Sequence, residues 1–185
     1  MDLSRVNDSS LHLRPATEHD RTYMVRLHYL AMVMGDEFAH LDESNPTETA
    51  KYVNQWSPQR DGGVIAVSDL SVPAGGAWLR YFTGPDKGSG YLGALDPKAD
   101  PADTSQWLTS YDPVRIPELA IAVERRYAGR GLGAMLIDAT CELAKSQQAP
   151  AVCLWVDPNN PRARRLYEAQ GFIDTTRPDT MVKFF

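Results

Sequence analysis

The chain has 185 residues, of which 43% are hydrophobic and 23% are charged, and its formal net charge is -5. This length suits one domain with a sizeable core, so we expect a single domain over residues 1–185. The acidic charge argues against nucleic acid or an anionic membrane as a partner, and no apolar run approaches the roughly 18 residues of a membrane span. The N-terminus lacks a signal-peptide pattern, and the two cysteines fit neither a disulfide framework nor a zinc site. The composition therefore predicts a soluble cytoplasmic protein without a bound metal.

The chain opens with the signals of a strand followed by a helix. The segment LHLRPAT, residues 11–17, predicts a short strand that ends near Pro15. Thr17 and Asp20 have the spacing of a capping box, and apolar residues at helical spacing follow them. We expect a helix over about residues 18–34.

A second helix and a hairpin are expected next. Asn45 is a favourable N-cap and Pro46 suits the first helical position. The buried stripe of this helix would comprise Ala50, Val53 and Trp56. The runs GVIAVSDL and GAWLRYFT, residues 63–70 and 76–83, predict two strands joined by a hairpin connection.

Residues 84–115 are rich in Gly, Pro, Asp and Ser and show no clear element. A stretch of this length is unusual inside a compact domain. Two interpretations stay open: a lid on the substrate side of a site, or a surface insertion with short elements near residues 105–111.

The second half of the chain alternates strand and helix signals most clearly. IPELAIAV, residues 116–123, predicts a strand, and after a glycine-rich segment comes a helix whose apolar side would be formed by Met135, Leu136, Ala139, Leu143 and Ala144. AVCLWV, residues 151–156, predicts another strand. Asn160 as N-cap, Pro161 in first position and Gly171 just past the end delimit a further helix, and the terminal MVKFF predicts a last strand. This order indicates an α/β or α+β fold around a mixed sheet.

Gly129, Gly131 and Gly133 alternate with other residues at the start of a predicted helix. Gly129, Gly131 and Ala134 match the dinucleotide-binding fingerprint G-x-G-x-x-A literally, but five residues separate them from their strand and too little chain follows to complete that fold. A tight turn alone would need fewer glycines. Backbone N–H groups at a helix N-terminus can hold an anion, and nearby positive charge comes from Arg125, Arg126 and Arg130. A pyrophosphate suits such a cradle.

The segment ELAIAVERRYAGRGLGAMLIDA resembles the acetyl-CoA-binding segment of the GNAT superfamily of N-acetyltransferases, in which a strand leads to Gln/Arg-x-x-Gly-x-Gly/Ala and a helix. Gly131 and Gly133 fill the glycine positions, whereas Ala128 stands where the family has Gln or Arg. LWVDPNNPRARRLYEAQGF resembles the second family segment, with matches at Asn160, Ala163, Leu166, Tyr167, Glu168, Gly171 and Phe172. RPATEHD resembles a GNAT opening. The resemblance implies a central mixed, mostly antiparallel β-sheet flanked by helices, with acetyl-CoA as cosubstrate.

The resemblance also implies where acetyl-CoA lies. Its pantetheine and thioester carbonyl would run beside the backbone of Ile121, Ala122 and Val123, with the Val123 N–H stabilising the tetrahedral oxyanion. Its pyrophosphate would lie on the loop formed by Ala128, Gly129, Arg130, Gly131, Leu132, Gly133 and Ala134. Arg126 or Arg130 would supply the charge that Ala128 lacks. One helix face would look at the cofactor and is formed by Asn160, Ala163, Arg164 and Tyr167.

Acetyl transfer to an amine needs a base and benefits from an acid. A free alkylamine has a pKa of about 10 and has to lose a proton before attack. Glu118 is the candidate base, because it is the one carboxylate on an otherwise apolar strand, where its pKa would be raised. Action through water, binding of the substrate ammonium and a place at an exposed strand end are the alternatives. Tyr167 is the candidate acid for the departing thiolate, with packing beside Leu166 as the alternative.

Other reactive side chains have weaker signals. Cys153 has no histidine near it in sequence, so core packing is expected rather than an acyl-enzyme. The histidines show no metal-ligand spacing, although His28 and His40 are candidates for an acceptor pocket. Candidates for the 3′-phosphate of coenzyme A, or alternatively for a solvated helix face, are Arg162, Arg164 and Arg165.

The sequence thus predicts an acyltransferase that moves the acetyl group of acetyl-CoA to a primary amine by direct attack in a ternary complex. A small-molecule amine and a peptide N-terminus both suit as acceptors. The alternative is a coenzyme A-binding regulatory protein without turnover. The terminal MVKFF would close the sheet or pair with a second subunit. The resemblance to the GNAT superfamily implies a homodimer.

Overall fold

The computed structural model describes residues 10–36, 46–83, 88–90, 115–175 and 177–185. The predicted N-cap Asn45, the candidate His40 and most of the segment 84–115, with its two interpretations, lie outside the described residues.

A seven-stranded sheet forms the centre of the described chain, in the order β1-β2-β3-β4-β5-β7-β6. Neighbouring strands run antiparallel except β4 and β5, which are parallel. The strands are β1 (Leu11–Pro15), β2 (Gly63–Ser68), β3 (Pro73–Arg80), β4 (Glu118–Val123), β5 (Ala151–Trp155), β6 (Ile173–Asp174) and β7 (Thr180–Phe184). This confirms the mixed sheet that the order of elements predicted and the mostly antiparallel arrangement that the resemblance implied. The C-terminal run closes the sheet within one chain, because β7 pairs with both β5 and β6.

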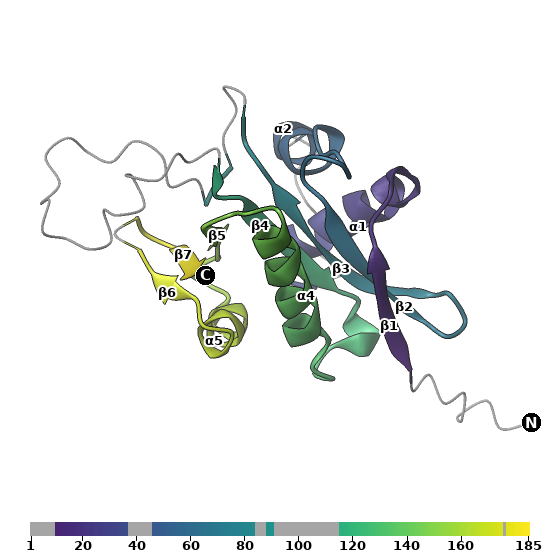
Figure 1. The fold of residues 1–185 in the computed structure, drawn as a ribbon. Coiled ribbons are helices and arrows are strands. Elements are labelled where there is room, and N and C mark those ends of the chain that lie inside the picture. The colour runs from purple at the N-terminus through teal and green to yellow at the C-terminus, as the bar shows by residue number, and fades with distance from the viewer. Residues whose placement is uncertain (1–9, 37–45, 84–87, 91–114, 176) are drawn as a thin grey trace, which may run out of the picture.

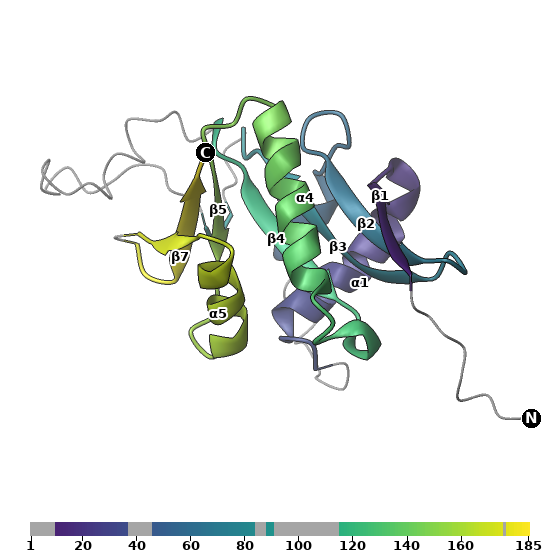
Figure 2. The same cartoon turned by 60° about the horizontal axis from the view of Figure 1, so that its bottom comes forward.

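Helices cover both faces of this sheet (Figures 1 and 2). One face carries α1 (Arg21–Met32), α2 (Pro46–Thr49) and the π-helical turn η3 (Ala50–Asn54), and the other carries α4 (Leu132–Ser146) and α5 (Pro161–Ala169). The predicted capping box between Thr17 and Asp20 is present, but the first turn after it is the 3₁₀ turn η2 (Glu18–Asp20). A second 3₁₀ turn, η6 (Arg125–Tyr127), leads from β4 toward α4.

Two helices bury different residues from those predicted. In α4 the predicted Met135 is 44% exposed, and the buried side consists of Leu132, Leu136, Ile137, Thr140, Cys141 and Ala144. In the second helical segment Val53 and Trp56 are buried as predicted, whereas Ala50 is only partly buried. The π-helical turn explains this difference, because it changes the spacing that an α-helical stripe assumes.

The hairpin between β2 and β3 also differs from the prediction, since β3 begins three residues before the expected range 76–83. The Ser68 N–H donates to the Val72 carbonyl over 2.9 Å and closes a tighter turn. Gly75 and Gly76 then lie inside the strand, where a Cβ atom would come within 2.8 Å of atoms on neighbouring elements. Close packing against these neighbours, rather than a turn, accounts for the two glycines.

No helix in the described ranges combines the length and apolar character that crossing a membrane requires. Cys141 and Cys153 are both buried and unpaired, as the sequence predicted.

Candidate active site

The strands β4 and β5 separate immediately after they meet. Within the described residues their ladder consists of the pair Glu118–Cys153, and the Cys153 N–H donates to the Pro117 carbonyl over 3.0 Å. On its other side β4 pairs with β3 along its whole length. The sheet is therefore open on the β5 side of residues 119–123.

The backbone groups of β4 alternate between the two neighbouring strands. The Pro117 carbonyl is bound by β5, whereas the Glu124 N–H donates to the Ala74 carbonyl of β3 over 2.9 Å. Odd-numbered residues thus direct their N–H groups into the opening, and these include Ile121 and Val123. Ala122, which was predicted with them, directs its backbone toward β3 instead.

The glycine loop leads from η6 into α4. Gly129 and Gly131 are exposed and have φ values of +76° and +78°, which residues with a side chain rarely adopt. Gly133 has another reason, because a Cβ there would come within 2.9 Å of Leu166 on α5. Gly131 is the N-cap of the 15-residue α4. The first intrahelical bond runs from the Met135 N–H to the Gly131 carbonyl over 3.2 Å. The N–H groups of Leu132, Gly133 and Ala134 precede it and can bind an anion.

Arginines surround this loop although Ala128 brings no charge. The Arg126 and Arg130 guanidinium carbons lie 4.6 and 5.7 Å from the centre of the Tyr127 ring. Arg126 also donates to the Tyr127 hydroxyl over 2.7 Å. Ala128 itself is exposed and extended, with φ -63° and ψ 145°. Both guanidinium groups thus lie on Tyr127 of η6, which precedes the glycine loop.

The start of α5 is held by its own side chains. The Asn160 Oδ1 accepts from the Ala163 N–H over 3.1 Å, which confirms the predicted N-cap. Arg164 donates to Asp174 of β6 over 2.5 Å, so its guanidinium faces the end of the sheet. Arg162 and Arg165 are exposed. Two of the residues predicted to face the cofactor, Asn160 and Arg164, therefore already use part of their hydrogen-bonding capacity within the chain.

Tyr167 is the buried residue of α5 and is 8% exposed. Its ring is tilted against Phe172, with centroids 6.0 Å apart. Burial raises the pKa of Tyr167 to about 12, so the phenol stays protonated at neutral pH. Within the described chain its hydroxyl makes no hydrogen bond, which leaves the proton available to a ligand.

Glu118 is buried at the point where β4 and β5 meet, with 3% exposure. Its Oε1 accepts from the Tyr52 hydroxyl over 2.5 Å. Burial raises the pKa of Glu118 to about 7, while the Tyr52 hydroxyl and the Gly90 N–H act in the opposite direction. The exposed strand end that was considered for this residue is thereby ruled out.

Tyr52 is a site residue that sequence reasoning missed. It lies on η3, and its ring stacks on His28 with centroids 5.4 Å apart and meets the edge of Phe82 at 5.5 Å. His28 is buried, which lowers its pKa. The predicted proximity of His28 to the acceptor side is consistent with this contact. The sequence offered no signal for Tyr52 beyond an aromatic residue beside a buried stripe.

Cys153 lies opposite Glu118, but its thiol is unsuited to nucleophilic attack. Burial first, and then the charge of Glu118, raise the pKa of Cys153 well above its usual value. A protonated thiol is a poor nucleophile. The predicted packing role fits this environment.

Comparisons with known proteins agree with this geometry. The model of the acetyltransferase (GNAT) family matches residues 30–172. Mycothiol acetyltransferase from Beutenbergia cavernae is 31% identical over 113 residues, and the match spans 60% of this chain and 35% of that protein's length. An acetyltransferase of the GNAT family from Staphylococcus aureus Mu50 superposes with a TM-score of 0.64 at 12% identity, covering 95% of this chain and 99% of the other.

A second solved structure comes from Salmonella typhimurium, is assigned as an acetyltransferase and contains its cofactor acetyl-CoA. It has a TM-score of 0.60 at 15% identity and covers 95% of this chain and 94% of the other. Both structural likenesses concern the fold, whereas the family model matches the sequence over most of the chain. The chain belongs to the acetyltransferase (GNAT) family of acyltransferases.

Proposed function

We propose that this chain transfers the acetyl group of acetyl-CoA to a primary amine by direct attack in a ternary complex. The observation that carries the proposal is the opening between β4 and β5, which begins at the buried carboxylate of Glu118. Such an opening exposes backbone N–H groups beside a group that can take up a proton near neutrality.

The residues around the opening suit the parts of acetyl-CoA. The N–H groups at the start of α4 and the positive-φ backbone of Gly129 and Gly131 suit the pyrophosphate. The edge of β4 at Ile121 and Val123 suits the amide groups of pantetheine. Asn160 and Ala163 flank this path on α5, and Arg164 would contribute after exchanging its contact with Asp174.

Three groups of the chain would act in the transfer, in which a C–N bond forms and the thioester C–S bond breaks. Glu118 accepts a proton from the acceptor ammonium, directly or through one water molecule. The Val123 N–H donates a hydrogen bond to the carbonyl oxygen as negative charge develops there. The Tyr167 hydroxyl donates a proton to the departing thiolate.

The acceptor is proposed only as a class. The curated relative is named for mycothiol, but the chain spans 35% of its length. We therefore propose a small-molecule amine or a peptide N-terminus, and a homodimer, which analytical ultracentrifugation would test. A coenzyme A-binding regulatory protein without turnover is the second candidate, favoured by the charge missing at Ala128.

Calorimetric titration with acetyl-CoA, followed by a thiol-release assay with a panel of amines and short peptides, tests the proposal. Binding with amine-dependent thiol release is the expected result. Binding without release for every acceptor class would favour the regulatory candidate. Absence of binding to both acetyl-CoA and coenzyme A would contradict both functions.

A further inference from the structure

In the described part of the chain, a single side chain hydrogen-bonds to the carboxylate of the candidate base Glu118, and it contacts only one of the two carboxylate oxygens. The Tyr52 hydroxyl donates to the Glu118 Oε1 over 2.5 Å and accepts from the Ser89 N–H over 2.8 Å. Its donor and an acceptor position are thus both used. Among the buried side-chain atoms of the described residues, the Glu118 Oε2 is the one that lacks a hydrogen-bond partner.

An unpaired carboxylate oxygen in a protein interior is costly, so its persistence calls for an explanation. An ionised carboxylate only accepts hydrogen bonds. The partner that Oε2 lacks is therefore a donor, and an amine or ammonium is such a donor. The unpaired oxygen marks the acceptor side of the carboxylate.

We propose that Tyr52 is a positioning residue for Glu118, which occupies Oε1 and thereby presents Oε2 to the acceptor amine. The proposal rests on the proposed function, because it assigns the amine to the acetyl acceptor. Glu118 is the proton-accepting group, and Tyr52 acts through it.

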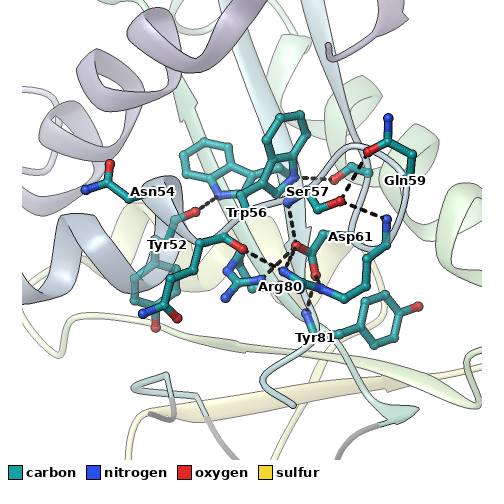
Figure 3. Close-up of polar contacts among 12 residues, drawn as sticks. Tyr52, Asn54, Trp56, Ser57, Gln59, Asp61, Arg80 and Tyr81 are labelled. Atoms are coloured by element: carbon teal, nitrogen blue, oxygen red, sulfur yellow. Dashed lines mark hydrogen bonds and ion pairs between the residues drawn. The ribbon is translucent and has the colours of Figure 1, made fainter. Parts of the chain in front are cut away.

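The backbone around Tyr52 is fixed from several directions (Figure 3). The Trp78 indole N–H donates to the Tyr52 carbonyl over 2.9 Å, and the Arg80 Nε donates to the Lys51 carbonyl over 2.7 Å. Arg80 is in turn held by the fully buried Asp61, with a 2.7 Å contact between them. A π-helical turn braced in this way holds the tyrosine hydroxyl at a fixed position. Such turns occur frequently at functional sites.

The segment Gly88–Gly90 covers the carboxylate. A Cβ at Gly88 would overlap the Glu118 Oε2, and one at Gly90 would lie 3.1 Å from its carboxyl carbon. The two glycines therefore permit the close approach of this segment.

Several titratable groups face Glu118 from different elements. Glu48 on α2 raises its pKa, whereas Arg177, which follows β6, lowers it. Cys153 faces it from β5, and Tyr52 from η3. The Tyr52 hydroxyl donates a hydrogen bond that favours the charged form of Glu118. Removing this hydroxyl should therefore raise the pKa of Glu118.

The test measures the titration of Glu118 directly. Protein labelled with ¹³C at the glutamate carboxyl groups is titrated by NMR as wild type and as Tyr52→Phe, and Glu118→Gln identifies the resonance. The midpoint is expected to rise by roughly one pH unit in Tyr52→Phe. The matched control is Tyr81→Phe, which loses a 2.8 Å hydrogen bond to Gln147 and should leave the midpoint unchanged. An unchanged or lowered midpoint in Tyr52→Phe would overturn the proposal.

A second readout follows the reaction. The acidic limb of kcat/KM is expected to move to higher pH in Tyr52→Phe by the same interval as the NMR midpoint, with the plateau above it retained. An equal loss at every pH would indicate a merely structural role and contradict the proposal. If the wild type releases no thiol with any amine, the proposed function fails, and the NMR titration still decides whether Tyr52 sets the state of Glu118.

Discussion

The glycine loop and the carboxylate cluster, which are the two halves of the candidate site, are built in opposite ways. The loop, residues 128–134, is contiguous, and the ligand groups that we propose for it are backbone N–H groups at one helix start. The cluster joins His28, Tyr52 and Glu118 from three separate elements, and all three side chains are buried. The loop therefore depends on backbone conformation, whereas the cluster depends on exclusion of water. Substitutions in the loop should therefore weaken the binding of acetyl-CoA, whereas substitutions in the cluster should slow the reaction.

The largest effect is expected for Glu118→Gln. An amide cannot take up the amine proton, so kcat/KM should fall by roughly 10²- to 10³-fold, while the dissociation constant for acetyl-CoA stays unchanged. Steady-state thiol release and calorimetry measure the two quantities. The control Glu142→Gln alters an exposed carboxylate on α4 that pairs with Lys145, and its activity should match the wild type. If Glu118→Gln were as active as Glu142→Gln, the base would be water rather than Glu118.

The same residue should make stability depend on pH. Its pKa is raised in the folded chain from an ordinary value of 4.5 to about 7. The folded state therefore holds the proton more tightly, and this stabilisation is complete below pH 4.5 and is lost as the pH rises through 7. The free energy of unfolding should decline by up to about 1.4 kcal/mol per pH unit within that window. Urea denaturation from pH 4.5 to 8 should show this decline in the wild type and not in Glu118→Gln; parallel curves would refute the raised pKa.

Tyr167→Phe tests whether the cofactor side also contributes a proton. Loss of the hydroxyl should lower kcat by roughly 10- to 100-fold, because the thiolate would depart without an acid. The acetyl-CoA dissociation constant should hold, since the ring still packs against Phe172. An unchanged kcat, measured with a fast amine acceptor, would leave Tyr167 as a packing residue.

Gly131→Ala tests whether the backbone conformation of the glycine loop determines the affinity for acetyl-CoA, without altering the buried carboxylate cluster. Its φ of +78° disfavours a side chain by about 1–2 kcal/mol, so the loop should rearrange and acetyl-CoA should bind roughly tenfold more weakly. The control Gly35→Ala has a φ of +81° and equally open surroundings, so it carries the same strain outside the loop. Calorimetry should show weaker binding for Gly131→Ala only. Equal binding by both variants would mean that the loop is not the pyrophosphate site.

The smallest effect concerns the cap of α5. Asn160→Ala removes the acceptor for the Ala163 N–H and should cost about 1 kcal/mol of unfolding free energy. The neighbouring Asn159, which is exposed, provides the control Asn159→Ala with an expected change near zero. Thermal or urea denaturation compares the two, and an equal loss would show that the cap is unimportant.

The sequence by itself determined the features that depend on neighbouring residues. The Thr17–Asp20 capping box, the Asn160 cap and the positive-φ glycines at 129 and 131 are all where local patterns predicted them. The order of strands and helices followed for the same reason, because hydrophobic spacing and caps are read within a few residues.

The tertiary structure decided what meets across long separations. Tyr52 and Glu118 are 66 residues apart, and nothing near either residue in sequence indicates their hydrogen bond. The early start of β3 and the π-helical turn likewise follow from packing against neighbouring elements rather than from local preference. The partner of a buried polar group depends on which elements the core brings together, and that is settled only when the sheet and its two helical layers have assembled.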